Sequence, residues 1–526
     1  NDILMAVNTP SQNGNTITFN KTASLSASGN NNIAINLQNG VTSDTGTTTI
    51  TGDNVDITFN GNNNSVYKVN GYIKKLEIDN GDDVAGSTYG VGKDNLGAPT
   101  QTGIGKIYLN GDNNTVYNGS AFVDDDTASK IVLGDAQLVG NYNTLVRLNG
   151  PSLDVVSNPT KAAVGAFAGK IHIQGAMGGE YAHWQPRNGT TNKYNVALYA
   201  GSGQNKAFGK GLISNLNGLL DNVKVEDINV GFGSAAEHSV LIFATNGTGV
   251  DVKNTIKPGN SSYAVITDGV KSGGGTVNRG YNTTDIKYSD TSRKTIMGYA
   301  DGVFSRLTNY ATGGGASVPK EQSTINFESD VDMVAKEGIA YYAIDGGKVK
   351  VGKAGTANQT RAGGGQSIVA FADGLDQAYV ASGISGWSTI DIVGNITAAD
   401  YMIIGDYGNR SNPERALVYQ NIGAYAKNGG QISIDESTPA TKAAEDDAAN
   451  IVVTQGGTAT ASTGQSTKSL VYGMGAFAEG DGSFINIKGD GIHVVTGPNS
   501  GVYARNKGAI NFAGNITNQN NLVKIK

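Results

Sequence analysis

The four histidines are the chain's only imidazole groups, so a catalytic site that needs a histidine base must use one of them. His172 lies between Ile171 and Ile173, and this alternation predicts a strand on which the histidine faces outward. The chain contains no Gly-x-Ser-x-Gly motif, the turn that exposes the nucleophile of many hydrolases. We therefore interpret His172 as a surface residue and expect no serine-type active site. The other three histidines are His183, His238 and His493.

Paired carboxylates would be the alternative catalytic device. A polysaccharide-cleaving enzyme needs two of them on adjacent outward positions, roughly 5 to 9 Å apart. Asp330 with Asp332, and the run Asp124-Asp125-Asp126 (124–126), provide carboxylates in this chain. Acidic residues are also ordinary at outward and loop positions. We predict that the chain is not an enzyme, and polysaccharide cleavage stays the alternative.

Two acidic turns resemble Ca²⁺ sites only in part. The segment GDGSFINIKGDGI (480–492) is similar to the glycine-aspartate nonapeptides that bind Ca²⁺, but the nine-residue repeat is not sustained. The turn 79–83, counted as an EF-hand loop, has Val84 where glycine belongs and Gly90 where the bidentate glutamate belongs. We predict no metal and no cofactor, with Ca²⁺ at one of these turns as the alternative.

One polar loop gathers the residue types that bind sugars. Sugar binding needs an exposed aromatic ring for stacking and a few fixed polar groups. Tryptophan occurs only twice in the chain, and one copy lies in this loop. The alternative is that this tryptophan caps the hydrophobic core. The predicted ligand-binding residues are Tyr181, His183, Trp184 and Arg187.

The composition narrows the class of protein. Glycine accounts for 75 of 526 residues and charged residues for 16%, against about 25% in an average globular chain. The net charge is −6, and no Lys/Arg cluster is dense enough to follow a phosphate backbone, so we expect no nucleic-acid partner. The absence of cysteine excludes disulfides and suits a chain that crosses an oxidising periplasm unfolded. No run of 18 apolar residues is present.

A phrase of a small residue, an aromatic residue and alanine recurs and is followed by a polar corner and an alternating apolar segment. The copies that begin at 340, 369, 423, 475 and 501 are separated by 29, 54, 52 and 26 residues. Because the two long intervals are close to double the short ones, we predict a unit of about 26 to 29 residues with some degenerate copies. A second phrase, a glycine followed by asparagines and a short apolar segment, recurs at 29, 61, 111 and, more loosely, 140.

These repeats predict an all-β chain, specifically a right-handed parallel β-helix, a solenoid with loop and short-helix insertions. Lys348–Val351 and Ile510-Asn511-Phe512 (510–512) alternate with period two, as strands with one buried face do. Each repeat would supply three strands that bury aliphatic residues on the repeats above and below. Glycine and asparagine suit the corners because both tolerate positive φ, and stacked asparagines can form amide ladders.

Two segments interrupt the pattern, and we expect them to be irregular insertions. Residues 178–225 include apolar residues at helical spacing between 212 and 223, and 271–320 contains two Gly-Gly-Gly runs. We also expect a helical turn at 411–418 and a surface excursion at 438–450. None of these indicates an independent domain, so the prediction is a single β-helical segment over 1–526. The start lacks signal-peptide features and the end resembles a strand cut mid-pattern, so we expect a piece of a longer protein.

The Asn/Gly corners, the lack of cysteine and phrases such as GAYAKNGG (423–430) and GVYARN (501–506) resemble the large fusobacterial type V autotransporter adhesins. The resemblance implies a β-helical passenger at the bacterial cell surface, anchored in the outer membrane by a C-terminal β-barrel that these residues do not include. It implies attachment to host-cell glycans, host receptors or other bacteria. No binding residue can be carried over from the family. A passive stalk, with adhesion located elsewhere, is the third function we consider.

Overall fold

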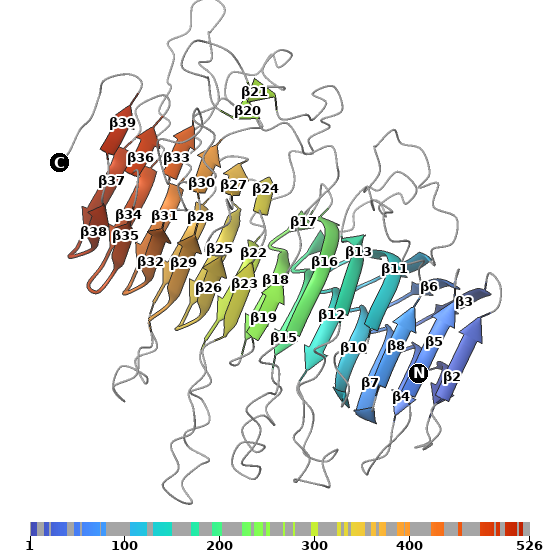
Figure 1. The fold of residues 1–526 in the computed structure, drawn as a ribbon. Coiled ribbons are helices and arrows are strands. Elements are labelled where there is room, and N and C mark those ends of the chain that lie inside the picture. Colours follow the sequence, from blue (N-terminus) through green and yellow to red (C-terminus); the bar gives the residue numbers. More distant parts are fainter. Residues whose placement is uncertain are drawn as a thin grey trace, which may run out of the picture. The chain divides into compact units, whose positions relative to one another are not determined.

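The structure, a computed structural model, describes the residues of the β-strands named below and the short turns that join some of them (Figure 1). The described turn residues are 2, 29–32, 61–64, 111–114, 140–143, 194–195, 238–239, 302, 323, 338, 345–347, 352, 374, 387–388, 428–430, 480–483, 488 and 506–508. The contacts divide the chain into two compact units, 1–260 with 300–326, and 261–299 with 327–526. Each described element is a β-strand, so the described part of the chain is all-β.

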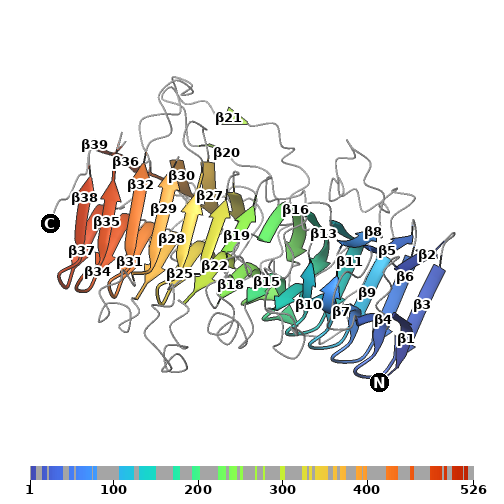
Figure 2. The same cartoon turned by 60° about the horizontal axis from the view of Figure 1, so that its bottom comes forward.

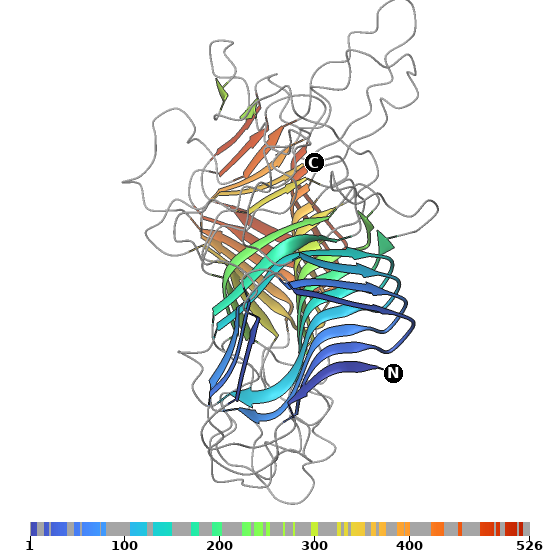
Figure 3. The ribbon, with the colours of Figure 1, turned by 90° about the vertical axis from the view of Figure 1, so that its right-hand side faces the viewer.

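The first unit contains two parallel sheets of stacked strands (Figures 1 and 3). In its first sheet the order is β1 (Ile3–Val7), β4 (Ile33–Gln38), β7 (Ser65–Ile73), β10 (Thr115–Val123), β12 (Thr144–Asn149), β15 (Val196–Gly201) and β18 (Val240–Thr245). In its second sheet the order is β2 (Asn15–Phe19), β5 (Thr47–Gly52), β8 (Lys75–Asp79), β11 (Lys130–Val139), β13 (Lys170–Met177), β16 (Val223–Phe232) and β19 (Gly249–Val252). The strands β3 (Ala23–Ser28), β6 (Val55–Asn60) and β9 (Lys106–Asn110) join this sheet through β11, and β14 (Asn192–Lys193) pairs with β17 (Ala236–Glu237).

The second unit contains three such sheets (Figure 2). Its first sheet holds β25 (Ile339–Ile344), β28 (Ile368–Asp373), β31 (Ile422–Lys427), β34 (Met474–Glu479) and β37 (Ser500–Arg505), and its second holds β26 (Lys348–Val351), β29 (Thr389–Val393), β32 (Gln431–Asp435), β35 (Phe484–Ile487) and β38 (Ala509–Phe512). The third holds β24 (Val331–Val334), β27 (Gln359–Gly363), β30 (Asn395–Ala399), β33 (Ile451–Thr454), β36 (Gly491–Val494) and β39 (Asn515–Asn518). The strands β20 (Thr267–Asp268) and β21 (Val277–Asn278) form an antiparallel pair, and β22 (Ile296–Asp301) and β23 (Thr324–Phe327) fall where the units divide.

In each sheet of the second unit, every strand pairs with the third strand after it in chain order. Each repeat therefore gives one strand to each of the three sheets. The copies predicted at 340, 369, 423, 475 and 501 occupy β25, β28, β31, β34 and β37, which pair in this order. The prediction that the phrase marks a structural repeat is therefore confirmed. The prediction that the long intervals hide degenerate copies is wrong, because Phe371 pairs directly with Tyr425 and Tyr425 with Phe477. A long interval is one repeat that carries extra residues between its strands.

The core of the second unit consists of aliphatic residues in register. Val349 and Val351 of β26 align with Ile390 and Ile392 of β29, and these side chains are buried. The same alternation continues through Ile434, which has no exposed surface, and the residues between the buried positions are at least partly exposed. Burial of every second residue is what the period-two pattern predicts. The hydrophobic rows therefore hold successive repeats together.

The corners of the first unit show why the sequence repeats glycine and asparagine there. Gly61 has φ +134°, and a Cβ built on it would overlap the backbone oxygen of Gly29 in the neighbouring repeat. Two residues further on, Asn31, Asn63 and Asn113 have φ of 61°, 58° and 57°. This left-handed region suits asparagine better than most residues. The expectation of positive φ at the corners is confirmed.

Two of the segments expected to be irregular contain described strands. The strand β15 lies within 178–225 and β22 lies within 271–320. Three other expectations lie outside the described residues: the helical residues at 212–223, the turn at 411–418 and the excursion at 438–450. The one exception is Val223, which begins β16. The single segment over 1–526 stays a prediction. Within the described part of the chain, we find no helix with the length and apolar character that a membrane crossing requires.

Candidate binding surfaces

The predicted ligand-binding residues Tyr181, His183, Trp184 and Arg187 lie outside the described residues, so their grouping stays a prediction. His172 lies on β13 and His493 on β36, and the side chains of both are outside the description. Of the predicted carboxylates, Asp332 is the second residue of β24. Asp330 and residues 124–126 lie outside the described residues. The pairing of these carboxylates therefore stays a prediction.

The acidic turn at 480–483 is described. Its carboxylate, Asp481, is exposed and pairs with Lys507, with 3.1 Å between Oδ2 and Nζ. The buried Ser483 hydroxyl donates to the Glu479 carbonyl at 2.6 Å and accepts the Gly429 N–H at 2.9 Å. In the described part of the chain, no three His, Cys, Asp or Glu residues are grouped as metal ligands. The described groups of this turn thus serve the packing of successive repeats.

An aromatic ladder runs across the first sheet of the second unit. Its ring centroids are 5.0, 4.9, 4.7, 4.7 and 5.3 Å apart in order, and the first five rings are nearly parallel, with interplanar angles of 8° or less. From Tyr342 to Tyr503 the rings are strand partners of one another, which explains why they stack. We use the name aromatic ladder for Tyr299, Tyr342, Phe371, Tyr425, Phe477 and Tyr503.

A charged network flanks one end of the aromatic ladder. Arg505 Nη2 lies 2.7 Å from Glu479 Oε1, and the Tyr425 hydroxyl donates to Glu479 Oε2 at 2.8 Å. The hydrogen bonds from Arg505 and then Tyr425 hold the pKa of Glu479 below its usual value. Burial, and then the hydrogen bond to Glu479, raises the pKa of Tyr425. The Arg505 guanidinium also lies over the Phe477 ring, 5.2 Å from its centroid.

The geometry of the aromatic ladder limits what it can bind. Each ring from Tyr342 to Phe477 lies between two neighbouring rings of the ladder. Phe477 is buried, and Tyr342, Phe371 and Tyr425 are only partly exposed, so little of these rings is open to a ligand. The ladder therefore presents ring edges and its flanking charges, and its main effect is to hold successive repeats in register.

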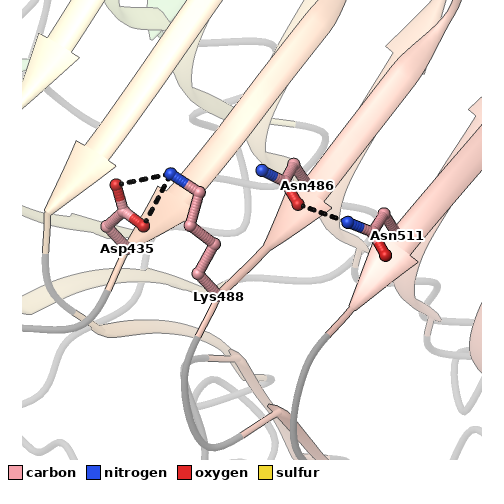
Figure 4. Close-up of polar contacts among 4 residues, drawn as sticks. All are labelled: Asp435, Asn486, Lys488 and Asn511. Carbon is pink, nitrogen blue, oxygen red and sulfur yellow. Dashed lines mark hydrogen bonds and ion pairs between the residues drawn. The ribbon is translucent and has the colours of Figure 1, made fainter.

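On the partly exposed side of the second unit's second sheet, where Phe484 is 37% exposed, polar side chains interact across neighbouring strands (Figure 4). Lys488 Nζ lies 3.2 Å from Asp435 Oδ1, and Asn511 donates through Nδ2 to Asn486 Oδ1 at 3.0 Å. Opposite charges and matched amides across the strands satisfy one another. Such exposed pairs contribute little to stability, about 0 to 1 kcal/mol each, so this side is a mixed polar surface.

A second aromatic stack lies on the corners of the first unit, and we call Tyr142, Tyr194 and His238 the aromatic corner. The ring centroids of Tyr142 and Tyr194 are 5.1 Å apart, and those of Tyr194 and His238 are 5.2 Å apart, with interplanar angles of 12° and 19°. Tyr142 is 56% exposed and Tyr194 45%. The aromatic corner is therefore much more accessible than the middle of the aromatic ladder.

Two rows of side-chain to backbone hydrogen bonds hold the corner in place. In the buried row, the backbone N–H of one buried corner asparagine donates to the side-chain oxygen of the buried asparagine in the next repeat. Asn114 N donates to Asn143 Oδ1 (2.7 Å), and Asn143 N donates to Asn195 Oδ1 (2.8 Å). In the outer row, the side-chain oxygen of a corner residue accepts a hydrogen bond from the backbone N–H of the following repeat. Asn141 Oδ1 accepts the Lys193 N–H in this way at 2.9 Å. The residues between these two rows are the ones that carry the aromatic rings.

Sequence reasoning missed the aromatic corner although part of its signal was visible. In the looser echo at Gly140, Tyr142 replaces the left-handed asparagine of the earlier corners. The segments KYNVALY (193–199) and EHSVLIF (237–243) are two further copies of that corner and its strand. Aligning the apolar strand that follows each corner would have found them.

No family model, no curated protein and no solved structure matches the chain.

Proposed function

We propose that this chain is the β-helical passenger segment of a bacterial cell-surface adhesin, displayed from the outer membrane, and that it attaches the cell to host glycans or receptors or to other bacteria. The observation that carries the proposal is the register of the stacked strands. Equivalent residues of successive repeats are strand partners, as are Asp391, Ser433, Asn486 and Asn511. Side chains on the exposed side therefore form rows that continue from repeat to repeat.

A right-handed parallel β-helix is the fold we propose for the two units. In the second unit each repeat visits three sheets before it returns to the first, which is the path of a helical winding. Parallel strands joined by a crossover are right-handed in about 98% of cases, because that hand lets the connection follow the strand twist. Such a winding has a filled interior, so its outer rows and corners are where a partner would contact it.

The chain's surface chemistry supports attachment by neutral and mixed polar contacts. Opposite charges alternate on the second unit's second sheet, as in Lys348 and Asp391 at 2.9 Å and Lys488 and Asp435 at 3.2 Å. The first unit adds exposed aromatic rings at its aromatic corner. Exposed aromatic side chains combined with satisfied polar groups are typical of recognition surfaces.

The direct test uses beads coated with the 526-residue chain and presented to cultured host cells and to other bacteria. We expect saturable attachment that an excess of the soluble folded chain abolishes. Beads coated with the heat-unfolded chain provide the matched control. If folded and unfolded coatings attach equally poorly, the adhesin proposal is wrong and the passive stalk becomes the better account. Release of sugars from a polysaccharide panel would instead favour the cleaving enzyme.

A further inference from the structure

The aromatic corner replaces a residue that the turn itself favours. At the equivalent corner position, six successive repeats of the first unit place a non-glycine residue in the left-handed conformation, with φ between 52° and 61°. The first three repeats use asparagine, which tolerates this conformation, and the next three use tyrosine, tyrosine and histidine. Histidine, like asparagine, is enriched in this conformation, whereas bulkier residues such as tyrosine adopt it at a cost. The turn alone therefore does not explain the two tyrosines.

Stacking does not explain them fully either, because the asparagines make equivalent contacts without strain. Asn113 Nδ2 donates to Asn63 Oδ1 at 2.6 Å, so an asparagine at this position already links one repeat to the next. Strained residues that persist where an unstrained one would serve are found preferentially at functional sites. The aromatic corner is thus a candidate for a role beyond folding.

The stacking is offset, which leaves part of each ring face accessible. Carbon atoms in contact are about 3.5 to 4.0 Å apart, whereas the centroids of Tyr142 and Tyr194 are 5.1 Å apart in nearly parallel rings. Rings in contact at that centroid distance must be displaced sideways by roughly 3 to 4 Å. The large exposed fractions of Tyr142 and Tyr194 agree with this displacement.

The polar groups beside the aromatic corner are either uncharged or form a pair of opposite charges. The ring of Tyr142 follows Asn113 in the row of corner residues and is preceded in the sequence by Asn141. Lys193 and Glu237 precede the other two rings and are strand partners of opposite charge. The Asp112 carboxylate, which accepts the Asn141 N–H at 2.8 Å, adds one negative charge in the preceding repeat. A strip of ring faces beside amides, with no excess of positive charge, matches a ligand that has apolar C–H faces and many hydroxyls. An anionic polymer would find no excess of positive charge at these residues.

We propose that Tyr142, Tyr194 and His238 form a binding strip for a neutral oligosaccharide, which lies across successive corners with its sugar rings against the aromatic rings. The strip offers one ring per repeat at 5.1 and 5.2 Å, a spacing close to the length of one sugar unit in an extended chain. This proposal deepens the adhesin function and rests on it, because it names the ligand class and the place where the ligand binds.

The chain supplies its own substitution for the test. Replacing all three residues with asparagine (Tyr142→Asn, Tyr194→Asn, His238→Asn) installs the residue that the three preceding repeats carry at the same φ. We therefore expect the triple variant to fold with an unchanged or higher melting temperature. The single variant Tyr194→Asn covers the case in which the triple variant does not fold. Tyr503→Asn removes another exposed tyrosine, 41% exposed, and is the matched control.

The 526-residue chain and its variants are applied to an array of neutral oligosaccharides that includes N-acetyllactosamine, fucosylated lactose and mannose oligomers, with heparin as an anionic probe. Wild type and Tyr503→Asn should bind at least one neutral oligosaccharide with equal affinity. The triple variant should bind it at least tenfold more weakly, and Tyr194→Asn should show part of that loss. Equal binding by the triple variant, or wild-type binding to heparin alone, would overturn the proposal.

The same proteins on beads separate this proposal from the adhesin function. If wild-type beads attach to cells but no neutral oligosaccharide is bound, the aromatic corner is not a sugar site and the adhesin function stands. If wild-type beads do not attach at all, the adhesin function itself fails, whatever the array shows.

Discussion

Removal of the Ile434 side chain tests whether stability is local to each repeat. Ile434 lies in β32 with no exposed surface, and its strand partners are Ile392 on one side and Ile487 on the other. Ile434→Ala should cost about 2 to 5 kcal/mol, from the lost burial and the cavity that remains between the two neighbours. Ile434→Asp should cost more, because it leaves an unpaired charge in the core.

Because a stacked repeat contacts only its neighbours, the loss should be confined to β32 and the strands beside it. Hydrogen exchange measured by mass spectrometry should show faster exchange in peptides from β29, β32 and β35, and limited proteolysis should begin near these strands. Ser433→Ala, on the outward side of the same strand, is the control and should change stability by no more than about 0.5 kcal/mol. Uniform acceleration over all peptides would refute the reasoning, as would equal effects of Ile434→Ala and Ser433→Ala.

Three further predictions concern a corner glycine, the Glu479 carboxylate and Trp184. Gly61→Ala should lower the melting temperature more than Gly302→Ala, since both glycines have positive φ but only the first would bring its Cβ onto a neighbouring backbone oxygen. Glu479 has a lowered pKa through its bond to Arg505, so its stabilising effect is present above its unfolded pKa of about 4.3 and is lost as the pH falls through the lowered value. Melting temperatures of wild type and Glu479→Gln should therefore differ at pH 7 and converge in acid. Trp184→Ala should weaken attachment to cells without changing the circular dichroism spectrum, and unchanged attachment would remove that residue from the site.

The repeat could be predicted because its signals are short and local. The alternation of Lys348–Val351 predicted a strand with one buried side, and Val349 and Val351 are buried. The asparagines of the corners predicted positive φ, and Asn63 shows it. Both features follow from backbone sterics and side-chain periodicity within a few residues.

The number of residues in a repeat could not be predicted in the same way. The 54 residues from 369 to 423 form one repeat, since Phe371 and Tyr425 are strand partners. The entropic cost of a longer connection grows only slowly with its length, so a repeat can gain many residues without disturbing its strands. A sequence interval therefore does not determine how many repeats it contains.

The predicted sugar-binding residues and the aromatic corner lie at different places in the chain. The residues around Trp184 lie outside the described residues and stay a prediction, whereas the most exposed tyrosines among the described residues are Tyr142 and Tyr194. A bulky residue in a left-handed corner contradicts the usual preference, so the preference that identified the asparagine corners concealed the aromatic ones. The aromatic ladder was visible in the sequence as a repeated phrase, but its stacking depends on the register of strands.

The register of neighbouring repeats is the central claim, and engineered disulfides test it most directly because the chain contains no cysteine. Asn486 and Asn511 are strand partners on the outward side of β35 and β38 (Figure 4). Adjacent strands are about 4.8 Å apart, within the Cα separation that a disulfide spans, whereas a pair that skips one strand is about 10 Å apart and exceeds it. On mild oxidation, the cysteine pairs 486/511 and 433/486 should cross-link, and the pair 433/511 should not. Cross-linking of 433/511 at the same rate as the two adjacent pairs would contradict the account.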